Sequence, residues 1–228
     1  MDTGSNSLST EGGRRLPGAA LLLAGLALAV HLLPGADQLL EFRREAAVAG
    51  QLWRFLSCHW AHFSLNHLSW DLLAFLVLGS ACEQFSRRRF VLAVFGSAIL
   101  VAAVSWFLLP GMTAYRGLSG IGSALFGLLT VQLIRDALRQ GTPRALLFPA
   151  SLLLLFLGKT GYELWAGASI FVSDYGAAVV PVPLAHLAGA AVGCTAALIR
   201  GPNTLRVRPY GNTPLTTSAS VPLSPAGG

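Results

Sequence analysis

Residues 116–127 read RGLSGIGSALFG and lie between two long apolar stretches of the chain. They contain four glycines and two serines, and Ser119 falls where the second apolar stretch begins. The first turn of a helix has backbone N–H groups without intrahelical partners and carries the positive end of the helix dipole. Gly117 and Gly120 bracket Ser119 and allow a sharp turn and the close approach of another backbone. The segment therefore predicts a helix start at which a serine could attack a carbonyl group while amides receive the oxyanion.

The composition indicates a membrane protein. Only 11% of the 228 residues are charged and the mean hydropathy is +0.61, whereas soluble domains carry about 25% charged residues. Most of the apolar runs are close to the ~20 residues that span a bilayer. They lie at 16–34, 67–82, 90–110, 117–134, 145–158 and 177–199. We expect an all-α polytopic membrane domain of six transmembrane helices over 16–200, between disordered tails at 1–15 and 201–228 that are rich in Gly, Ser, Thr and Pro.

The basic residues predict the orientation of these helices. With the N-terminus in the cytoplasm, 11 of the 16 Lys and Arg residues fall on the cytoplasmic side. They are Arg14, Arg15, Arg87, Arg88, Arg89, Arg135, Arg139, Arg144, Arg200, Arg206 and Arg208. The positive-inside rule then places both termini in the cytoplasm. The net charge of +6 is accordingly interpreted as membrane topology, and no nucleic-acid partner is expected.

This orientation brings polar residues from three separate helices to one depth. His62, His67, Asp71, Ser119 and His186 all lie toward the external ends of the helices or loops that carry them. Ionisable groups inside a membrane are costly and usually functional. Taken singly, a G-x-S-G segment is common in transporters and channels, and a lone membrane histidine is more often a packing partner. Their convergence favours a catalytic site.

His186 lies in a run of small residues that permits close helix packing. Gly189 and Gly193 form a G-x-x-x-G step on the same segment, and such steps let two helix backbones approach closely. Packing against the glycine-rich start at 117–127 could therefore bring His186 to Ser119 as a general base.

Four segments together resemble the rhomboid intramembrane serine proteases. WRFLSCHWAHF (53–63) resembles the W-R-x-x-[ST] segment of that family, and HFSLNHLSWD (62–71) resembles H-x-x-x-x-H-L-x-x-N. GLSGIGSALFG (117–127) resembles G-x-S-G-x-x-x-A-x-x-G, and AHLAG (185–189) resembles A-H-x-x-G. The resemblance covers about 50–200 and identifies the chain as a candidate member of this family.

The resemblance implies a Ser119–His186 dyad without a third carboxylate, and 177–199 contains neither Asp nor Glu. It also implies that His67 and the residue four positions later help to hold the oxyanion, with Gly117 and Gly120 shaping the turn. That later residue is Asp71, where the family has asparagine. An ionised carboxylate cannot donate a hydrogen bond, so Asp71 would be protonated or would orient His67.

Further residues have two readings each. Arg54 either anchors an external loop at the membrane interface or, as the family suggests, braces it from within. Lys159 and Glu163 are four residues apart and share a helix face. They form either an interfacial salt bridge or a feature of the rhombosortase branch, which KTGYE (159–163) resembles. Gly189 is expected to be structural.

Ser123 is a second departure from the family, since many rhomboids carry an aromatic residue there. Trp53, Trp60 and Trp70 are expected to form an external aromatic belt. His59, His62 and His67 lack Cys and Asp partners at metal-ligand spacing, so no metal and no cofactor are expected.

The sequence thus predicts an intramembrane serine endopeptidase. Its expected partners are membrane lipid and single-pass membrane substrates cleaved near the external face. The rhombosortase resemblance implies substrates with C-terminal Gly-Gly anchors and a bacterial inner membrane. Two alternatives stay open: a catalytically inactive rhomboid-like protein that binds transmembrane helices, and a small-solute transporter.

Overall fold

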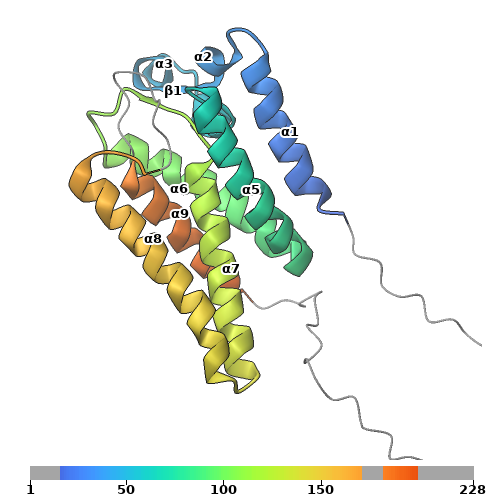
Figure 1. The fold of residues 1–228 in the computed structure, drawn as a ribbon. Coiled ribbons are helices and arrows are strands. Elements are labelled where there is room, and N and C mark those ends of the chain that lie inside the picture. Colours follow the sequence, from blue (N-terminus) through green and yellow to red (C-terminus); the bar gives the residue numbers. More distant parts are fainter. Residues whose placement is uncertain (1–15, 171–181, 200–228) are drawn as a thin grey trace, which may run out of the picture.

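The computed structural model describes residues 16–170 and 182–199, and nearly all of its regular structure is helical (Figure 1). The longer helices are α1 (Gly18–Leu32), α5 (Leu65–Phe85), α6 (Arg87–Phe107), α7 (Ser119–Arg139), α8 (Leu147–Ala166) and α9 (Pro183–Leu198). The short elements are α2 (Ala36–Leu40), β1 (Phe42–Arg43), α3 (Arg44–Val48), α4 (Arg54–Ser57), η1 (Cys58–Trp60), β2 (Ala114–Tyr115) and η2 (Pro143–Leu146).

Each predicted apolar run corresponds to one of the longer helices. Within the described residues, four stretches are long and apolar enough to cross a membrane: α5, α6, α7 and the continuous stretch of η2 and α8. Helices α1 and α9 are apolar but have 15 and 16 residues. A multi-pass helical protein is therefore confirmed, whereas the count of six spans stays a prediction. The predicted tails at 1–15 and 201–228, and the start of the run at 177–199, lie outside the described residues.

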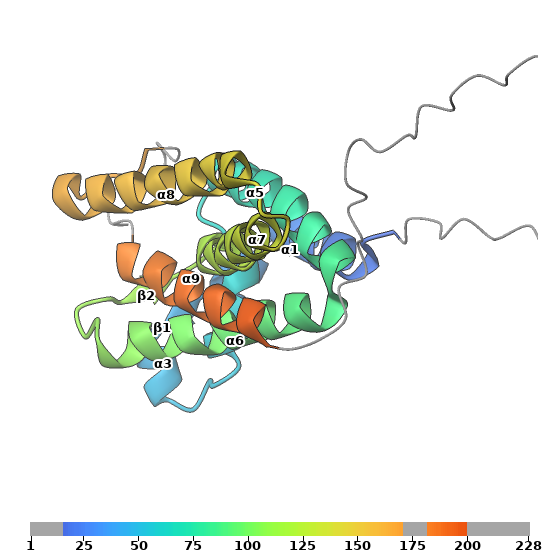
Figure 2. The same cartoon turned by 90° about the horizontal axis from the view of Figure 1, so that it is seen from below.

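Helix α7 is the centre of the bundle and is surrounded by α5, α6, α8 and α9 (Figure 2). Half of its most apolar stretch is buried inside the protein, against 11% for the stretch that contains α8. The core on one side of α7 is formed by large apolar side chains such as Phe75, Phe90 and Leu125, all of them buried. The start of α7 is thus held from several sides.

The contact between α7 and α9 depends on small residues. A Cβ atom at Gly189 would overlap the carbonyl oxygen of Gly120, and one at Gly193 would overlap that of Ala124. On the facing helix, a Cβ at Gly127 would lie 2.6 Å from the carbonyl oxygen of Ala190. These two backbones are therefore in direct contact, as the G-x-x-x-G step predicts. We call this contact the α7–α9 seam.

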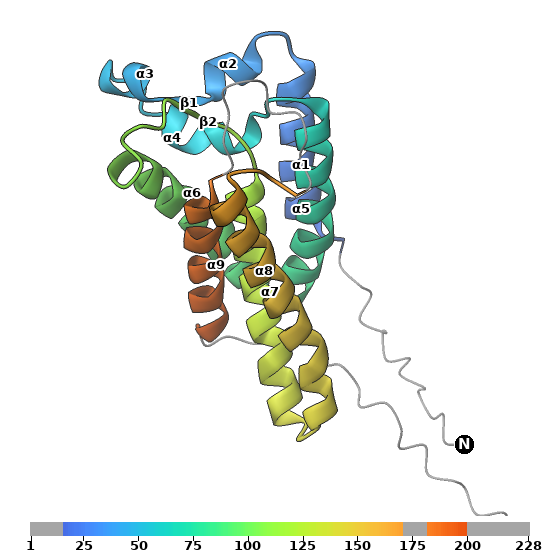
Figure 3. The same cartoon turned by 60° about the vertical axis from the view of Figure 1, so that its left-hand side comes forward.

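A layer of short elements covers one end of the bundle (Figure 3). It contains α2, α3, α4, η1 and the antiparallel pair of β1 and β2, in which Phe42 faces Tyr115. The Arg44 guanidinium ties this layer to α6, because it donates hydrogen bonds to the carbonyl oxygens of Ser105, Trp106 and Leu109. Those carbonyls belong to the last turn of α6 and the residues after it, where a helix leaves carbonyl groups without intrahelical partners.

The opposite end of the bundle carries basic residues. There Arg89, near the start of α6, donates to the carbonyl oxygen of Ile199, and Arg135, near the end of α7, donates to that of Ala197. The carboxylate of Glu83 accepts hydrogen bonds from the first amides of α1 at 2.8 and 3.1 Å. The starts of α1 and α6 and the ends of α5, α7 and α9 therefore share this end.

Candidate active site

A sharp turn delivers the chain into the start of α7. Gly117 has a φ of +120°, a conformation that side chains other than glycine rarely adopt. A Cβ atom there would lie 2.8 Å from His67 Nε2 and 3.0 Å from Asp71 Oδ2. Two hydrogen bonds fix the turn: the Gly117 amide donates to the Cys58 carbonyl at 3.1 Å, and the Leu118 amide donates to Asp71 Oδ2 at 2.8 Å. α7 then begins at Ser119, two residues after the start of the predicted run at 117–134, so Ser119 lies on the first turn as expected.

Asp71 is the centre of a polar cluster behind this turn. Its Oδ2 lies 3.2 Å from His62 Nε2 and 3.3 Å from His67 Nε2, in addition to the Leu118 amide. The residue is buried. Because Asp71 Oδ2 accepts the Leu118 amide and faces two imidazole nitrogens, the geometry supports the interpretation in which Asp71 orients its neighbours.

Ser119 and His186 line one cavity of about 770 Å³. Its remaining polar lining residues are Asp71, Ser123, Lys159, Glu163 and Ser169, and the other walls are apolar side chains, mainly from α5, α7 and α8. Ser123 donates its hydroxyl to the Ser119 carbonyl at 2.9 Å. His67 is buried beside Asp71 and is not a lining residue. The structure thus brings Ser119, His186 and Asp71 to one cavity, with His67 behind it.

A carboxylate contacts the imidazole of His186. Glu163 Oε2 lies 3.1 Å from His186 Nδ1, and Glu163 Oε1 accepts a hydrogen bond from Lys159 Nζ at 2.6 Å. The Glu163 side chain is about 1% exposed. Lys159, Glu163 and His186 therefore form a continuous chain of contacts from α8 to α9.

One expectation from the sequence needs correction here. The resemblance implied no third carboxylate near the dyad, but the contact of Glu163 with His186 supplies one from α8. The predicted Lys159–Glu163 salt bridge is present, and Glu163 is buried in the cavity wall. The i, i+4 spacing of the two residues was the available signal. The packing of α8 against α9, which carries the contact, leaves no pattern in either segment.

The external loop residues have mixed outcomes. Arg54 is buried and donates hydrogen bonds to the carbonyl oxygens of Gln38 and Glu41 at 2.9 and 2.7 Å, so it braces the loop from within. Trp53 and Trp70 are exposed, which suits an aromatic belt. Trp60 is 8% exposed and packs in the core, so the prediction that it joins the belt is wrong. Trp70 also lines the cavity of Ser119 and His186.

Tyr115 is a residue near the site for which the sequence offers no signal. Its hydroxyl lies 3.3 Å from the position that a Cβ of Gly120 would take, directly beside the start of α7. Burial raises the pKa of this phenol well above its usual value, so the group stays protonated. β2 places it there through its pairing with β1.

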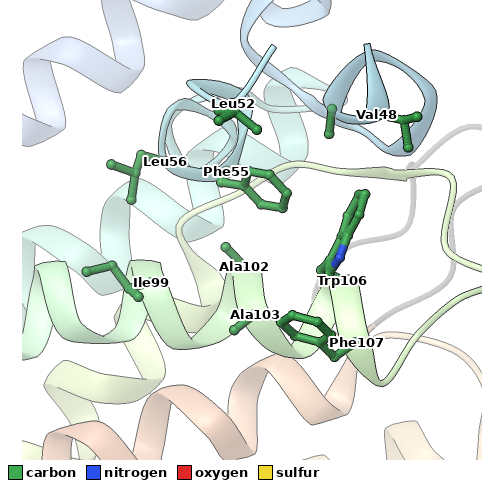
Figure 4. A pocket seen from close by; sticks show the side chains of 10 residues that line it. Val48, Leu52, Phe55, Leu56, Ile99, Ala102, Ala103, Trp106 and Phe107 are labelled. Carbon is green, nitrogen blue, oxygen red and sulfur yellow. The ribbon is translucent and has the colours of Figure 1, made fainter. Parts of the chain in front are cut away.

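A second cavity of about 600 Å³ lies between the outer layer and α6 (Figure 4). Its lining residues are all apolar or aromatic, and Phe55 meets Trp106 there with ring centroids 5.4 Å apart. It offers no nucleophile, acid or base. Among residues 16–170 and 182–199, no group of three or more His, Cys, Asp or Glu side chains is arranged to hold a metal ion.

A comparison with protein families identifies a relationship for this chain. A family model described as the rhomboid domain matches residues 49–203, a range that contains the turn, the cavity and the α7–α9 seam. No curated protein matches the chain in a sequence comparison. The rhomboid match covers well over half of the 228 residues and indicates an intramembrane-protease-like protein that acts on membrane proteins. The chain belongs to the rhomboid family.

Proposed function

We propose that this protein is an intramembrane serine endopeptidase in which Ser119 is the nucleophile and His186 the general base. The observation that carries the proposal is the shared cavity: Ser119, at the start of α7, and His186, on α9, line one space whose other walls are largely apolar. An apolar wall suits a transmembrane substrate, and the polar residues gather where chemistry would occur.

The reaction follows from these two side chains. Ser119 Oγ attacks the scissile carbonyl carbon, and its proton passes to the free ring nitrogen, Nε2, of His186. The tetrahedral intermediate collapses when His186 returns that proton to the leaving amine, which breaks the C–N bond. A water molecule then attacks the acyl-enzyme and gives one proton to His186. That proton returns to Ser119 Oγ as the new carboxyl product leaves.

The developing oxyanion would be held by the first amides of α7. The first intrahelical acceptor serves Gly122, whose amide donates to the Leu118 carbonyl, so the amides before it point out of the helix end. Asp71 and His67 support this arrangement by holding the Gly117 turn. This assigns the support role to residues that the family resemblance had linked to the oxyanion directly.

The distribution of charge supports the predicted topology. The end of the bundle that carries Arg89 and Arg135 lies opposite the layer above Ser119. Under the positive-inside rule the basic end is cytoplasmic, with both termini on that side and six spans in total. Cleavage would then occur near the external face of the membrane, which we assign to the bacterial inner membrane.

The substrate class follows from access to Ser119. The scissile segment must leave its own helix and lie extended across the cavity. Glycines favour this because they are poor helix formers and fit where a side chain would clash. A C-terminal anchor with a Gly-Gly pair, a transmembrane helix and a basic tail, as in rhombosortase substrates, meets this requirement.

The test uses purified protein in lipid with a single-pass fusion that ends in such an anchor. We expect Ser119→Ala and His186→Ala each to abolish cleavage, with the double variant no worse, because the two residues act as a unit. Ser123→Ala is the matched control, since it removes a neighbouring hydroxyl from the same cavity and should leave most of the activity. Cleavage by Ser119→Ala would refute the assignment of the nucleophile.

The runner-up is an inactive rhomboid-like protein that binds transmembrane helices. One observation favours it: Asp71 accepts the Leu118 amide where the family has a residue able to donate. It predicts that wild type and Ser119→Ala bind a transmembrane anchor equally and that neither cleaves it.

A further inference from the structure

Glu163 and His186 are two buried groups whose facing atoms have no other partner. His186 is 8% and Glu163 2% exposed. Within the described part of the chain, neither His186 Nδ1 nor Glu163 Oε2 has a hydrogen-bond partner, and the two atoms lie 3.1 Å apart. A buried polar atom without a partner costs free energy. A small reorientation of the imidazole would satisfy both atoms at once.

The proton on the imidazole decides what His186 can do. A neutral imidazole carries its proton on one ring nitrogen and presents a lone pair on the other. A carboxylate that faces Nδ1 favours the tautomer with the proton on Nδ1, because an Nδ1 lone pair would be repelled by the negative oxygen. The lone pair is then left on Nε2, the nitrogen available to take the proton of Ser119.

We propose that Glu163 is a positioning residue that holds His186 in the Nδ1-protonated tautomer and stabilises its imidazolium form, so that the site operates as a Ser119–His186–Glu163 triad. The inference rests on the proposed function and deepens it. Its logic is that of the Ser-His-Asp triad, with the carboxylate supplied by a third helix. Glu163 makes no contact with the substrate in this scheme.

Lys159 keeps this carboxylate ionised in an apolar wall. Its ammonium group donates to Glu163 Oε1, which leaves Oε2 for His186. A buried carboxylate without a countercharge would tend to take up a proton and would then lose its preference for the Nδ1–H tautomer. Lys159 therefore acts one step further from the chemistry, and its removal should cost less than the removal of Glu163.

The first experiment measures the reactivity of Ser119 without any peptide substrate. A fluorophosphonate probe forms a bond between Ser119 Oγ and phosphorus, releases fluoride, and passes the serine proton to His186. In the full chain in lipid, we expect Glu163→Gln to lower the rate of labelling about 10²–10⁴-fold. Glu163→Asp should restore part of the rate, and Lys159→Met should lower it less than tenfold.

The matched control is Glu83→Gln. Glu83 is also a carboxylate with a little-exposed side chain, about 7%, but it accepts hydrogen bonds from α1 at the opposite end of the bundle. It should destabilise the fold without changing the labelling rate per folded molecule. With the Gly-Gly fusion as substrate, Glu163→Gln should lower kcat and leave KM nearly unchanged, because the residue acts only through His186.

The second experiment reads the tautomer directly and does not depend on activity. The chain has five histidines, so ¹⁵N-histidine spectra compared with those of His186→Ala identify the His186 signals. We expect a protonated Nδ1 in wild type and in Glu83→Gln, and a mixed tautomer in Glu163→Gln. A wild-type labelling rate and tautomer in Glu163→Gln would overturn the triad while leaving the dyad intact. Equal labelling of wild type and Ser119→Ala would instead overturn the proposed function.

Discussion

The glycines of the α7–α9 seam and those of helix α8 differ in the space around them. In the seam, Gly189 and Gly193 touch the backbone of α7 so closely that a Cβ atom at either would overlap it. On α8, a Cβ atom at Gly158 or Gly161 would meet nothing within 4 Å. The same residue type is therefore a packing requirement in one helix and is unconstrained by packing in the other.

This difference separates two tasks within one site. Ser119 and His186 lie on the two helices of the seam, where backbone contact fixes their relative position. Glu163 and Lys159 lie on α8, whose stretch is only 11% buried within the protein and which forms one wall of the cavity. The nucleophile and base are thus held by direct backbone contact, while the carboxylate sits on the least buried of the four long apolar stretches. If α8 moves aside for a substrate, His186 loses Glu163 until α8 returns.

The largest loss of stability is expected when a side chain is added in the α7–α9 seam. Gly193→Ala places a methyl group where the carbonyl oxygen of Ala124 lies, and backbone cannot move aside as a side chain can. We expect a loss of more than about 3 kcal/mol in the free energy of unfolding, together with loss of cleavage. Thermal unfolding in detergent micelles measures the first effect. A Gly193→Ala protein with wild-type stability would show that α7 and α9 separate easily and would end the comparison.

The turn before Ser119 should be the next most sensitive position. Gly117→Ala combines strain at a φ of +120° with contacts to His67 and Asp71, and we expect a cost of about 2–3 kcal/mol and loss of cleavage. Gly35→Ala is the matched control, because Gly35 has a φ of +79° but open space around it. It should cost only the backbone strain and leave cleavage unchanged. Equal effects of the two substitutions would show that close packing against His67 and Asp71 does not contribute to stability or cleavage.

The seam was predictable from the sequence and the role of α8 was not. Small residues at i, i+4 spacing, such as Gly189 and Gly193, predict close helix packing from a short stretch of sequence, because two backbones can touch only where side chains are absent. The turn at Gly117 and the cavity position of Ser119 follow from the same kind of local signal.

The contact between Glu163 and His186 left no such signal. It joins two helices that are connected through residues partly outside the described chain, and its geometry depends on how α8 leans on α9. Trp60 was misplaced for a related reason: tryptophans favour the membrane interface, but η1 turns this one into the core. Tyr115 reaches the site only because β2 pairs with β1, and two-residue strands carry no periodicity that a sequence could show.

The contact between η1 and α6 should make the stability of the protein depend on pH. His59, in η1, is completely buried, and its Nε2 lies 3.0 Å from the carbonyl oxygen of Ala98 on α6. Burial lowers the pKa of His59 to about 4, whereas the unfolded chain takes up this proton near pH 6.5. The unfolded state therefore binds more protons between these values, so stability is complete above about pH 6.5 and is lost as the pH falls toward 4.

His59→Gln isolates this contribution, because glutamine can still donate to Ala98 but does not titrate. We expect the stability advantage of wild type over this variant to shrink by on the order of 1–2 kcal/mol between pH 7 and pH 5. Thermal unfolding of both proteins across this range measures the change. Parallel curves would mean that His59 does not titrate differently on folding, and the tie between η1 and α6 would then be independent of pH.

The smallest effect is expected on α8, and it has the opposite sign. Gly158 lines the cavity of Ser119 and His186, and Gly158→Ala adds a methyl group in open space there. It also replaces a poor helix former with the best one, which in soluble helices is worth about 0.8–1.0 kcal/mol. The lipid already favours helical backbone, because no water is present to satisfy free amide and carbonyl groups, so the gain should be below about 1 kcal/mol. Stability should therefore rise slightly or stay unchanged, in contrast to the same substitution at Gly193.

The rate of cleavage is the more informative measurement for Gly158→Ala. If α8 must bend or move to admit a substrate, the stiffer helix should lower the rate of cleavage. Fluorophosphonate labelling of Ser119 should then stay at the wild-type level, because a small probe reaches the cavity without that motion. A loss of both readouts would instead mean that Gly158 shapes the resting cavity, and α8 would then belong to the fixed part of the site.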